Sequence, residues 1–219
     1  MFYNFFVKNK LFIFDLDGTL VNTVVDLNVA INYGLKNNNF PTVSVEHTAK
    51  AIGNGIVITI WRSLPKGTSE EAHKRVLSDF RKYYREHYLD NSKSYPEMVE
   101  TLTLLKNRGY LLAVATNKLD EIATKMISAL FPNIFDFVQG DLPEFPKKPD
   151  PYLLNKVINK FGVDKSDVTY VGDSEVDIET ATNAGVKLIL VDYGYHRSEE
   201  FLKDLRGLHV NNPIKLLDK

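Results

Sequence analysis

The feature that most constrains the fold is a short apolar run, residues 11–14, that leads directly into Asp15 and Asp17. An apolar run of this length, bounded by glycine and a hydroxyl residue, predicts a buried strand of a parallel sheet. Buried carboxylates need a cation, a proton or strong hydrogen-bond donors. Ligands of such sheets bind at the carboxyl ends of strands, where this pair falls. A simpler interpretation stays open, in which Asp17 and Gly18 form a turn and Asp15 accepts hydrogen bonds from loop amides.

Strand-like and helical segments alternate from Tyr95 to the last predicted strand. Strands are predicted at 110–115, 135–139, 168–172 and 186–192, and helices between Pro96 and Gly109, at 118–130, at 152–161 and from about 175. Repeated strand–helix units predict a parallel sheet with helices on both faces. The expected fold class is therefore α/β, with a Rossmann-like, doubly wound core.

The segment between the first strand and Tyr95 has helical periodicity instead. Apolar residues recur at four-residue steps at 27, 31 and 35 and again at 72, 76, 80 and 84, and Ser69 is placed to begin the second helix. A crossover between neighbouring parallel strands needs only about a dozen residues. We therefore predict a small all-helical cap at 21–90, inserted into an α/β core formed by 1–20 and 91–219.

Composition and charge limit the classes of partner and of site that the chain can have. The 219 residues carry a formal net charge of −1 without a dense Lys/Arg block, which argues against nucleic acid as a partner. The absence of cysteine excludes disulfides, thiolate metal sites and a cysteine nucleophile. The apolar residues at 2, 5, 6 and 7 form too short a run to cross a bilayer. They predict an entry segment or an edge strand in a cytoplasmic protein with no membrane partner.

Polar residues also follow three later strands of the predicted sheet: Thr116 and Asn117, then Lys148, then Asp173 with Asp177. Each has an alternative interpretation. Thr116 or Asn117 could cap the next helix, and Lys148 could be a solvated loop lysine. Asp173 could be an N-cap, and Ser174 with Asp177 fits a capping box. The carboxyl ends of parallel strands meet at one edge of the sheet, however, so we expect these side chains to converge there.

The chemistry of the expected cluster points to phosphate. Several carboxylates against one lysine require a divalent cation, and hard oxygen ligands with room for water favour Mg²⁺. A cation, a lysine, a threonine hydroxyl and backbone amides together form a receptor for a dianion, for which phosphate is the natural guest. One carboxylate could attack phosphorus, and the other, two residues along, could transfer a proton.

The segments "DLDGTL", "TN", "KPDP" and "GDSEVD" occur in this order over nearly the whole chain. Together they resemble the four motifs of the haloacid dehalogenase-like superfamily of phosphatases. The insertion after the first motif, with "IGNG" inside it and "GYH" after the last strand, resembles the phosphoglycolate phosphatase branch. Asn22 departs from the aspartate found in many relatives, but it lies outside the four motifs.

The resemblance implies a role for each residue of the first three motifs. Asp15 would be the nucleophile and a Mg²⁺ ligand. Asp17 would be the general acid/base and would give its backbone carbonyl to the metal. Thr116 and the backbone at Asn117 would bind the phosphoryl group, and Lys148 would hold that group while neutralising Asp15.

By the same resemblance, Asp173 would complete the Mg²⁺ site, and Asp177 would hold Lys148 or a metal-bound water. Discrimination between esters must then come from the cap, because the phosphoryl group is common to all of them. In the cap, Gly53 and Gly55 would let the backbone approach a ligand, and Asn54 offers a donor and an acceptor. Alternatively, this loop is only a turn between helices with a glycine C-cap.

These expectations define a function. The chain is expected to be a Mg²⁺-dependent phosphatase that hydrolyses a small phosphomonoester through an aspartyl phosphate, with 2-phosphoglycolate as the favoured substrate and a monomer or homodimer as the assembly. A pyrophosphatase or a sugar phosphomutase of the same fold stays open, as does a silent phosphate-binding regulatory protein. Asp17 argues against a dehalogenase, because a halide leaving group needs no proton. The histidines match no metal spacing, although His196 would follow the last strand.

Overall fold

The computed structural model describes residues 10–195 and 209–218. The apolar N-terminal run and His196 lie outside this part of the chain, so the expectations for them stay predictions. The strands are β1 (Leu11–Phe14), β2 (Val21–Asn22), β3 (Lys93–Ser94), β4 (Leu111–Leu119), β5 (Phe137–Asp141), β6 (Val168–Gly172), β7 (Lys187–Val191) and β8 (His209–Val210). The helices are α1 (Val24–Asn37), α2 (Val45–Ala51), α3 (Ile56–Ser63), α4 (Glu70–His87), α5 (Met98–Asn107), α6 (Asp120–Leu130), α7 (Tyr152–Phe161) and α8 (Glu175–Ala184), with 3₁₀ turns at Lys165–Asp167 and Pro213–Asp218.

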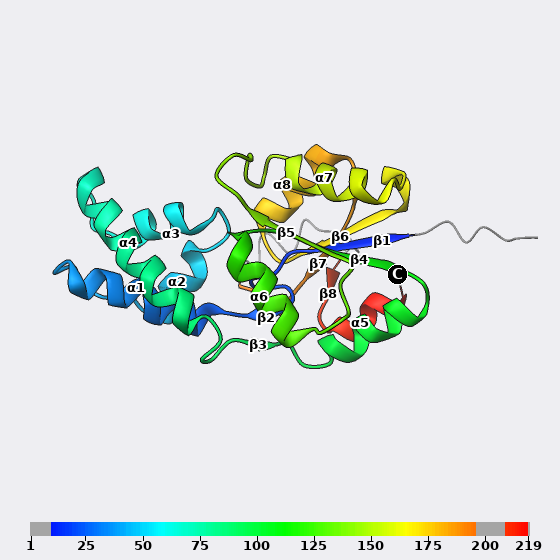
Figure 1. Cartoon of the computed structure of the whole chain (residues 1–219), viewed down its shortest axis with the longest axis horizontal. Helices are drawn as coiled ribbons and strands as arrows, with labels where there is room; N and C mark the ends of the chain where they lie inside the picture. The colour runs from blue at the N-terminus through cyan, green and yellow to red at the C-terminus, as the bar shows by residue number, and fades with distance from the viewer. Residues whose placement is uncertain (1–9, 196–208, 219) are drawn as a thin grey trace, which may run out of the picture.

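The six-stranded sheet has the order β5-β4-β1-β6-β7-β8, and all of its strands run parallel. β1 lies between β4 and β6, so the chain winds outward from β1 in both directions. Figure 1 shows α7 and α8 on one face of this sheet and α5 and α6 on the other. The predicted doubly wound α/β core is confirmed.

The alternation of side chains along β1 divides the core into two layers. Leu11 and Ile13 pack with the residues of α7 and α8, whereas Phe12 and Phe14 pack with those of α5 and α6. Successive side chains of a strand point to opposite faces, so a strand covered on both sides must be apolar throughout. The apolar run 11–14 is thus a buried inner strand of the sheet.

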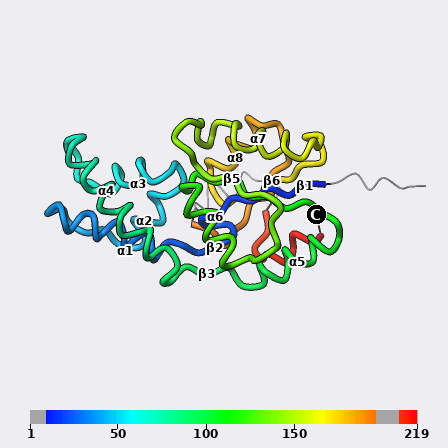
Figure 2. Tube along the Cα trace, in the orientation of Figure 1, coloured from blue at the N-terminus to red at the C-terminus, as the bar shows by residue number. Residues whose placement is uncertain are grey.

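The predicted helical insertion is confirmed as α1 to α4, which lie together at one end of the molecule (Figure 2). The Ser69 side chain accepts a hydrogen bond from the backbone N–H of Ala72 and caps α4, as its position predicted. Gly34 lets α1 approach α4 closely, because a Cβ there would lie 2.7 Å from the carbonyl oxygen of Val76. The buried apolar residues of the insertion form a cluster of their own, which Ile122 of α6 joins from the core.

Two features differ from the expectations. β2 and β3 pair as a short antiparallel ribbon at the base of the insertion, which apolar periodicity could not reveal in strands this short. β4 continues to Leu119, with an irregular register against β5 after Ala115, so Thr116 and Asn117 lie inside the strand and α6 begins at Asp120. Within the described residues, no helix combines the length and apolar character needed to cross a membrane.

Candidate active site

Side chains from four segments meet where β1, β4 and β6 end. Asp15 follows β1, Asp173 follows β6, Thr116 lies near the end of β4, and Lys148 comes from the loop before α7. All four line one cavity of about 90 Å³, which cap residues such as Tyr84 line as well. The convergence expected from the strand ends is therefore present in the structure.

Lys148 is the buried cation of this cluster. Its Nζ lies 2.8 Å from Oδ1 of Asp15 and 2.9 Å from Oδ1 of Asp177, and it donates a 2.9 Å hydrogen bond to the hydroxyl of Tyr170. The contact with Asp15 is an ion pair without hydrogen-bond alignment, so Oδ1 of Asp15 is a buried oxygen that accepts no hydrogen bond from the described residues. Lys148 is thus buried and ion-paired, not a solvated loop lysine.

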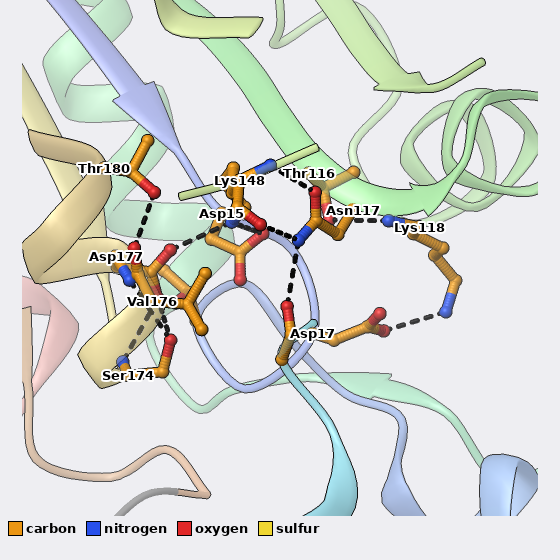
Figure 3. A network of polar contacts seen from close by, with 12 residues as sticks. Asp15, Asp17, Thr116, Asn117, Lys118, Lys148, Ser174, Val176, Asp177 and Thr180 are labelled. Carbon is orange, nitrogen blue, oxygen red and sulfur yellow. Dashed lines mark hydrogen bonds and ion pairs between the residues drawn. The ribbon is translucent and has the colours of Figure 1, made fainter. Parts of the chain in front are cut away.

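Asp177 combines the two interpretations that its position allowed. Its Oδ1 contacts Lys148, and its Oδ2 accepts from the backbone N–H groups of Asp173 and Ser174 and from the Ser174 hydroxyl. The Ser174 side chain accepts in turn from the N–H of Asp177, which completes a capping box with Ser174 as the N-cap of α8. One carboxylate therefore fixes the start of α8 and orients Lys148 (Figure 3).

Asp173 is held on both of its oxygens. The hydroxyl of Thr19 donates to Oδ1 at 3.1 Å, and the backbone N–H of Tyr195 donates to Oδ2 at 2.8 Å. Gly18, with φ near +90°, brings the loop after β1 so close that a Cβ there would lie 2.3 Å from Asp173. The carboxylate thus sits in a fixed orientation beside the end of β1.

The electrostatics of this cluster call for a cation. Asp15, Asp173 and Asp177 each offer a carboxylate oxygen within 4.8 Å of the others. Burial raises the pKa of Asp15 to about 6, with Asp177 adding to the rise and Lys148 opposing it. Burial, Asp177 and Asp15 also raise the pKa of Asp173 well above its ordinary value. Burial acts against ionisation of Asp177 too, but Lys148 and Ser174 hold its pKa below the ordinary range.

These observations fit a divalent metal bound by Asp15 and Asp173. Asp15 has an unsatisfied buried oxygen, and both residues resist ionisation in the absence of a positive charge. Carboxylate oxygens are ligands of hard cations such as Mg²⁺. Both oxygens of Asp177 already accept hydrogen bonds, so its place is beside the metal, where it orients Lys148.

Asp17 lies two residues beyond Asp15 and lines the same cavity. Its Oδ1 accepts from the Thr23 hydroxyl at 2.6 Å and from Nζ of Lys118 at 2.8 Å. Among the described residues, Oδ2 accepts no hydrogen bond. Asp17 is therefore held on one oxygen and keeps the other available at the cavity.

Thr116 and Asn117 have different surroundings. Thr116 lines the cavity, and its hydroxyl accepts from the backbone N–H of Lys118 at 3.3 Å. The side chain of Asn117 accepts from the N–H of Lys148 at 2.9 Å and donates to the carbonyls of Lys148 and Gly53, both at 3.0 Å. Neither residue caps α6, whose N-cap is Leu119 with no side-chain hydrogen bond. Asn117 instead fixes the Lys148 loop and touches the cap.

The loop 53–55 connects α2 and α3 and lies beside the cavity. Gly53 and Gly55 line the cavity, whereas Asn54 is not among the lining residues. The side chain of Asn54 accepts a 2.8 Å hydrogen bond from Arg62 of the cap itself. In this structure the loop therefore presents its backbone to the site.

Sequence reasoning missed Lys118, because residues from 118 onward were assigned to a helix. Lys118 lies in β4, and its Nζ donates to Oδ1 of Asp17 and to the hydroxyl of Tyr84, both at 2.8 Å. Tyr84, whose spacing predicted only the helix, packs in the cap core and also lines the cavity. No clear signal for Lys118 was present in the sequence, because Asn117 is of a type that is rare in strands and common at the start of helices.

A parallel α/β sheet with a helical insertion, and with aspartates, a threonine and a lysine at adjoining strand ends, defines a hydrolase of the phosphoryl-transfer type. The family model described as haloacid dehalogenase-like hydrolase matches residues 12–191. The chain belongs to this family, and it is an enzyme of the phosphatase class.

Relatives with closely matching lengths support this assignment. A phosphoglycolate phosphatase of Haemophilus influenzae is 37% identical over 85% of this chain and 87% of its own. A phosphoglycolate phosphatase of Aquifex aeolicus is 31% identical, and the match covers 95% of this chain and 97% of that protein. The crystal structure of a predicted phosphoglycolate phosphatase from Haemophilus somnus has a TM-score of 0.88 and 33% identity, and the match covers 97% of this chain and 98% of that one.

Proposed function

We propose that the chain is a Mg²⁺-dependent phosphatase that hydrolyses 2-phosphoglycolate through an aspartyl phosphate on Asp15. The observation that carries the proposal is the ion-paired Asp15 beside Asp173 at the floor of a small cavity. The names of the relatives in Haemophilus influenzae and Aquifex aeolicus support the choice of substrate. The cap that covers the site is proposed to comprise residues 21–90.

In the first step, a carboxylate oxygen of Asp15 attacks phosphorus while the bond from phosphorus to the ester oxygen breaks. Asp17 gives a proton to that ester oxygen, and the alcohol leaves. In the second step, Asp17 takes a proton from water as the water oxygen attacks phosphorus. The bond between phosphorus and Asp15 breaks, which releases inorganic phosphate and regenerates both carboxyl groups.

The other residues hold the phosphoryl group in place. The Thr116 hydroxyl and the backbone at Asn117 donate to its oxygens, and Lys148 contributes a positive charge. The three oxygens around Nζ of Lys148 fix its position before substrate arrives, which is the arrangement expected of a preorganised site. Mg²⁺, held by Asp15, Asp173 and the backbone carbonyl of Asp17, would neutralise negative charge on the transferring group.

The size of the cavity favours a small leaving group. A volume of about 90 Å³ is well below the roughly 300 Å³ or more of sites for drug-sized ligands. Much of its cap lining is apolar, including Leu27, Ile52, Ile56 and Phe80. Such a site accommodates a short alcohol better than a sugar.

The decisive experiment compares the wild-type protein with the Asp15→Asn variant. We expect the wild type to hydrolyse 2-phosphoglycolate and an aryl phosphate in the presence of Mg²⁺, and to lose both activities when the metal is chelated. Asp15→Asn should melt as the wild type does but lose turnover, because an amide oxygen is a poor nucleophile. A wild-type protein with no Mg²⁺-dependent activity on either ester would refute the proposal, as would a folded variant with near wild-type rates.

The same assay separates the enzyme alternatives. A pyrophosphatase would prefer inorganic pyrophosphate to every ester, and a phosphomutase would convert a hexose phosphate to its isomer without releasing phosphate. A silent regulatory protein would bind phosphate in the presence of Mg²⁺ but release none from any ester. A preference for 2-phosphoglycolate over all of these substrates is the result that we expect.

A further inference from the structure

Lys118 is a buried cation that the proposed reaction does not use. Its side chain is 5% exposed and lines the cavity between the core and the cap. An ammonium group has three N–H donors. Two of them reach Asp17 and Tyr84, and the third finds no acceptor among the described residues. A buried N–H donor without a partner is unfavourable, so this position calls for a further acceptor.

Lys148 provides the internal comparison. Its ammonium group donates to Asp177 and Tyr170 and forms an ion pair with Asp15, so three oxygens of the core lie 2.8–2.9 Å from Nζ. The two buried lysines of the site therefore differ. Three oxygens of the core surround Nζ of Lys148, whereas two oxygens of the described residues contact Nζ of Lys118, which leaves a place for a third oxygen from a molecule in the cavity.

We propose that Lys118 binds a carboxylate of the leaving group and thereby selects phosphate esters with an acid group next to the ester carbon. The inference rests on the proposed function and adds the residue that recognises the substrate. It names a substrate class, the phosphomonoesters of short 2-hydroxy acids, of which 2-phosphoglycolate is the smallest member.

The position of Lys118 relative to Asp17 determines how far from the ester oxygen the carboxylate of the substrate can lie. Asp17 must touch the ester oxygen to protonate it, and Nζ of Lys118 lies 2.8 Å from the other side of that carboxyl group (Figure 3). A carboxylate one carbon away from the ester oxygen can therefore meet Lys118 while Asp17 meets the ester oxygen. An acid group several carbons away would extend into the apolar cap lining.

Two other cations line the cavity but are less suited to this role. Arg81 and Arg85 are exposed residues of α4, and Arg85 also faces Glu121 at 3.8 Å. Solvent screens an exposed ion pair, so its contribution is small. A buried ammonium discriminates more strongly, because a neutral ligand would leave its donor unpaired.

The test uses a matched pair of substrates, 2-phosphoglycolate and 2-hydroxyethyl phosphate, which differ in a carboxylate against a hydroxymethyl group. We would measure kcat/KM for both with the full-length wild-type protein, Lys118→Met and Lys118→Arg in saturating Mg²⁺. The ratio of the two values is the readout, because any disturbance of Asp17 affects both esters alike. Far-UV circular dichroism and melting check that each variant folds.

We expect the wild type to prefer the acid and Lys118→Met to lose that preference by about tenfold to a hundredfold, the scale of a hydrogen bond to a charged group. Lys118→Arg should keep most of it. If Lys118→Met does not fold, Lys118→Gln, which removes the charge but stays polar, is measured in its place and should lose most of the preference. If Lys118→Met folds and the ratio of the two kcat/KM values is unchanged, Lys118 does not recognise the carboxylate, and the proposed phosphatase function still stands. A wild type without preference for the acid would instead refute 2-phosphoglycolate as the substrate.

Discussion

At the scale of single residues, the site depends on two aspartates with different surroundings. Asp15 is buried against Lys148, whereas Asp17 is held by Thr23 and Lys118 on one oxygen and exposes the other to the cavity. The first arrangement suits a fixed nucleophile, and the second suits a group that exchanges protons with a ligand. Residue type and spacing alone could not distinguish these roles, because both aspartates follow the same strand.

The role of Asp17 predicts an effect that depends on the leaving group. We expect Asp17→Asn to lower kcat by at least about a hundredfold with an alkyl phosphate, the usual scale of general acid–base catalysis. The loss should be smaller with an aryl phosphate, whose leaving oxygen needs less protonation. Parallel assays with the two esters measure the difference, and equal losses would argue that Asp17 has a purely structural role.

The carboxylate cluster predicts a pH-dependent response to metal. The raised pKa values of Asp15, about 6, and Asp173 mean that the metal-free fold retains protons that the unfolded chain releases above about pH 4. The stability that these groups contribute is therefore present below about pH 4 and is lost as the pH rises through about 6. Mg²⁺ requires the deprotonated carboxylates, so it should compensate for this loss at higher pH.

Thermal melting with and without Mg²⁺ measures this response. We expect the increase in Tm caused by Mg²⁺ to be a few °C larger at about pH 7.5 than at about pH 5. Asp173→Asn serves as the control and should show almost no Mg²⁺-dependent increase at either pH. A wild-type increase that is the same at both pH values would show that Asp15 and Asp173 do not bind the metal.

At the scale of elements, the sequence predicted most of the core but not its connections. The apolar segments and the glycine and serine boundaries were enough for β1, β6, α4 and α7, because these elements bury long or continuous apolar faces. The ribbon of β2 and β3 has two residues in each strand, too few for a periodic pattern. The end of β4 was placed too early, which concealed Lys118.

The ribbon belongs to a clamp at the base of the insertion. Asp26 of α1 is buried, and its carboxylate accepts from the backbone and side chain of Asn91 and from the backbone and hydroxyl of Ser92. The two connections between core and insertion are thereby joined by one carboxylate. Asp26 lies 65 residues before Asn91 in the sequence, so no local sequence pattern predicts this contact.

We expect Asp26→Ala to lower the free energy of unfolding by about 2–6 kcal/mol, because the two buried donors of Ser92 lose their acceptor and each costs about 1–3 kcal/mol. Chemical denaturation measures the change. Glu70→Ala is the matched control, since the exposed pair of Glu70 with Lys74 contributes less than about 1 kcal/mol. A loss no greater than that of the control would mean that the clamp is not a stabilising contact.

At the scale of the whole molecule, the cap and the core enclose the cavity together. Lys118 donates to Tyr84 of α4, and Asn117 donates to the carbonyl of Gly53, so two contacts at the site join β4 to the cap. The cavity is small in this arrangement. An ester larger than the cavity can react only if these contacts open, which links substrate size to the closure of the cap.

Tyr84→Phe tests this link by removing one hydroxyl while keeping the buried ring. We expect kcat/KM for a bulky aryl phosphate to rise about tenfold relative to 2-phosphoglycolate, since a hydrogen bond to a charged group contributes about 1.5–3 kcal/mol to the closed form. Tyr83→Phe is the control, because Tyr83 lies on the same helix but stacks on Tyr33 in the cap. If both variants shift the ratio equally, or neither does, the size of the ester is selected by the cavity walls and not by closure of the cap.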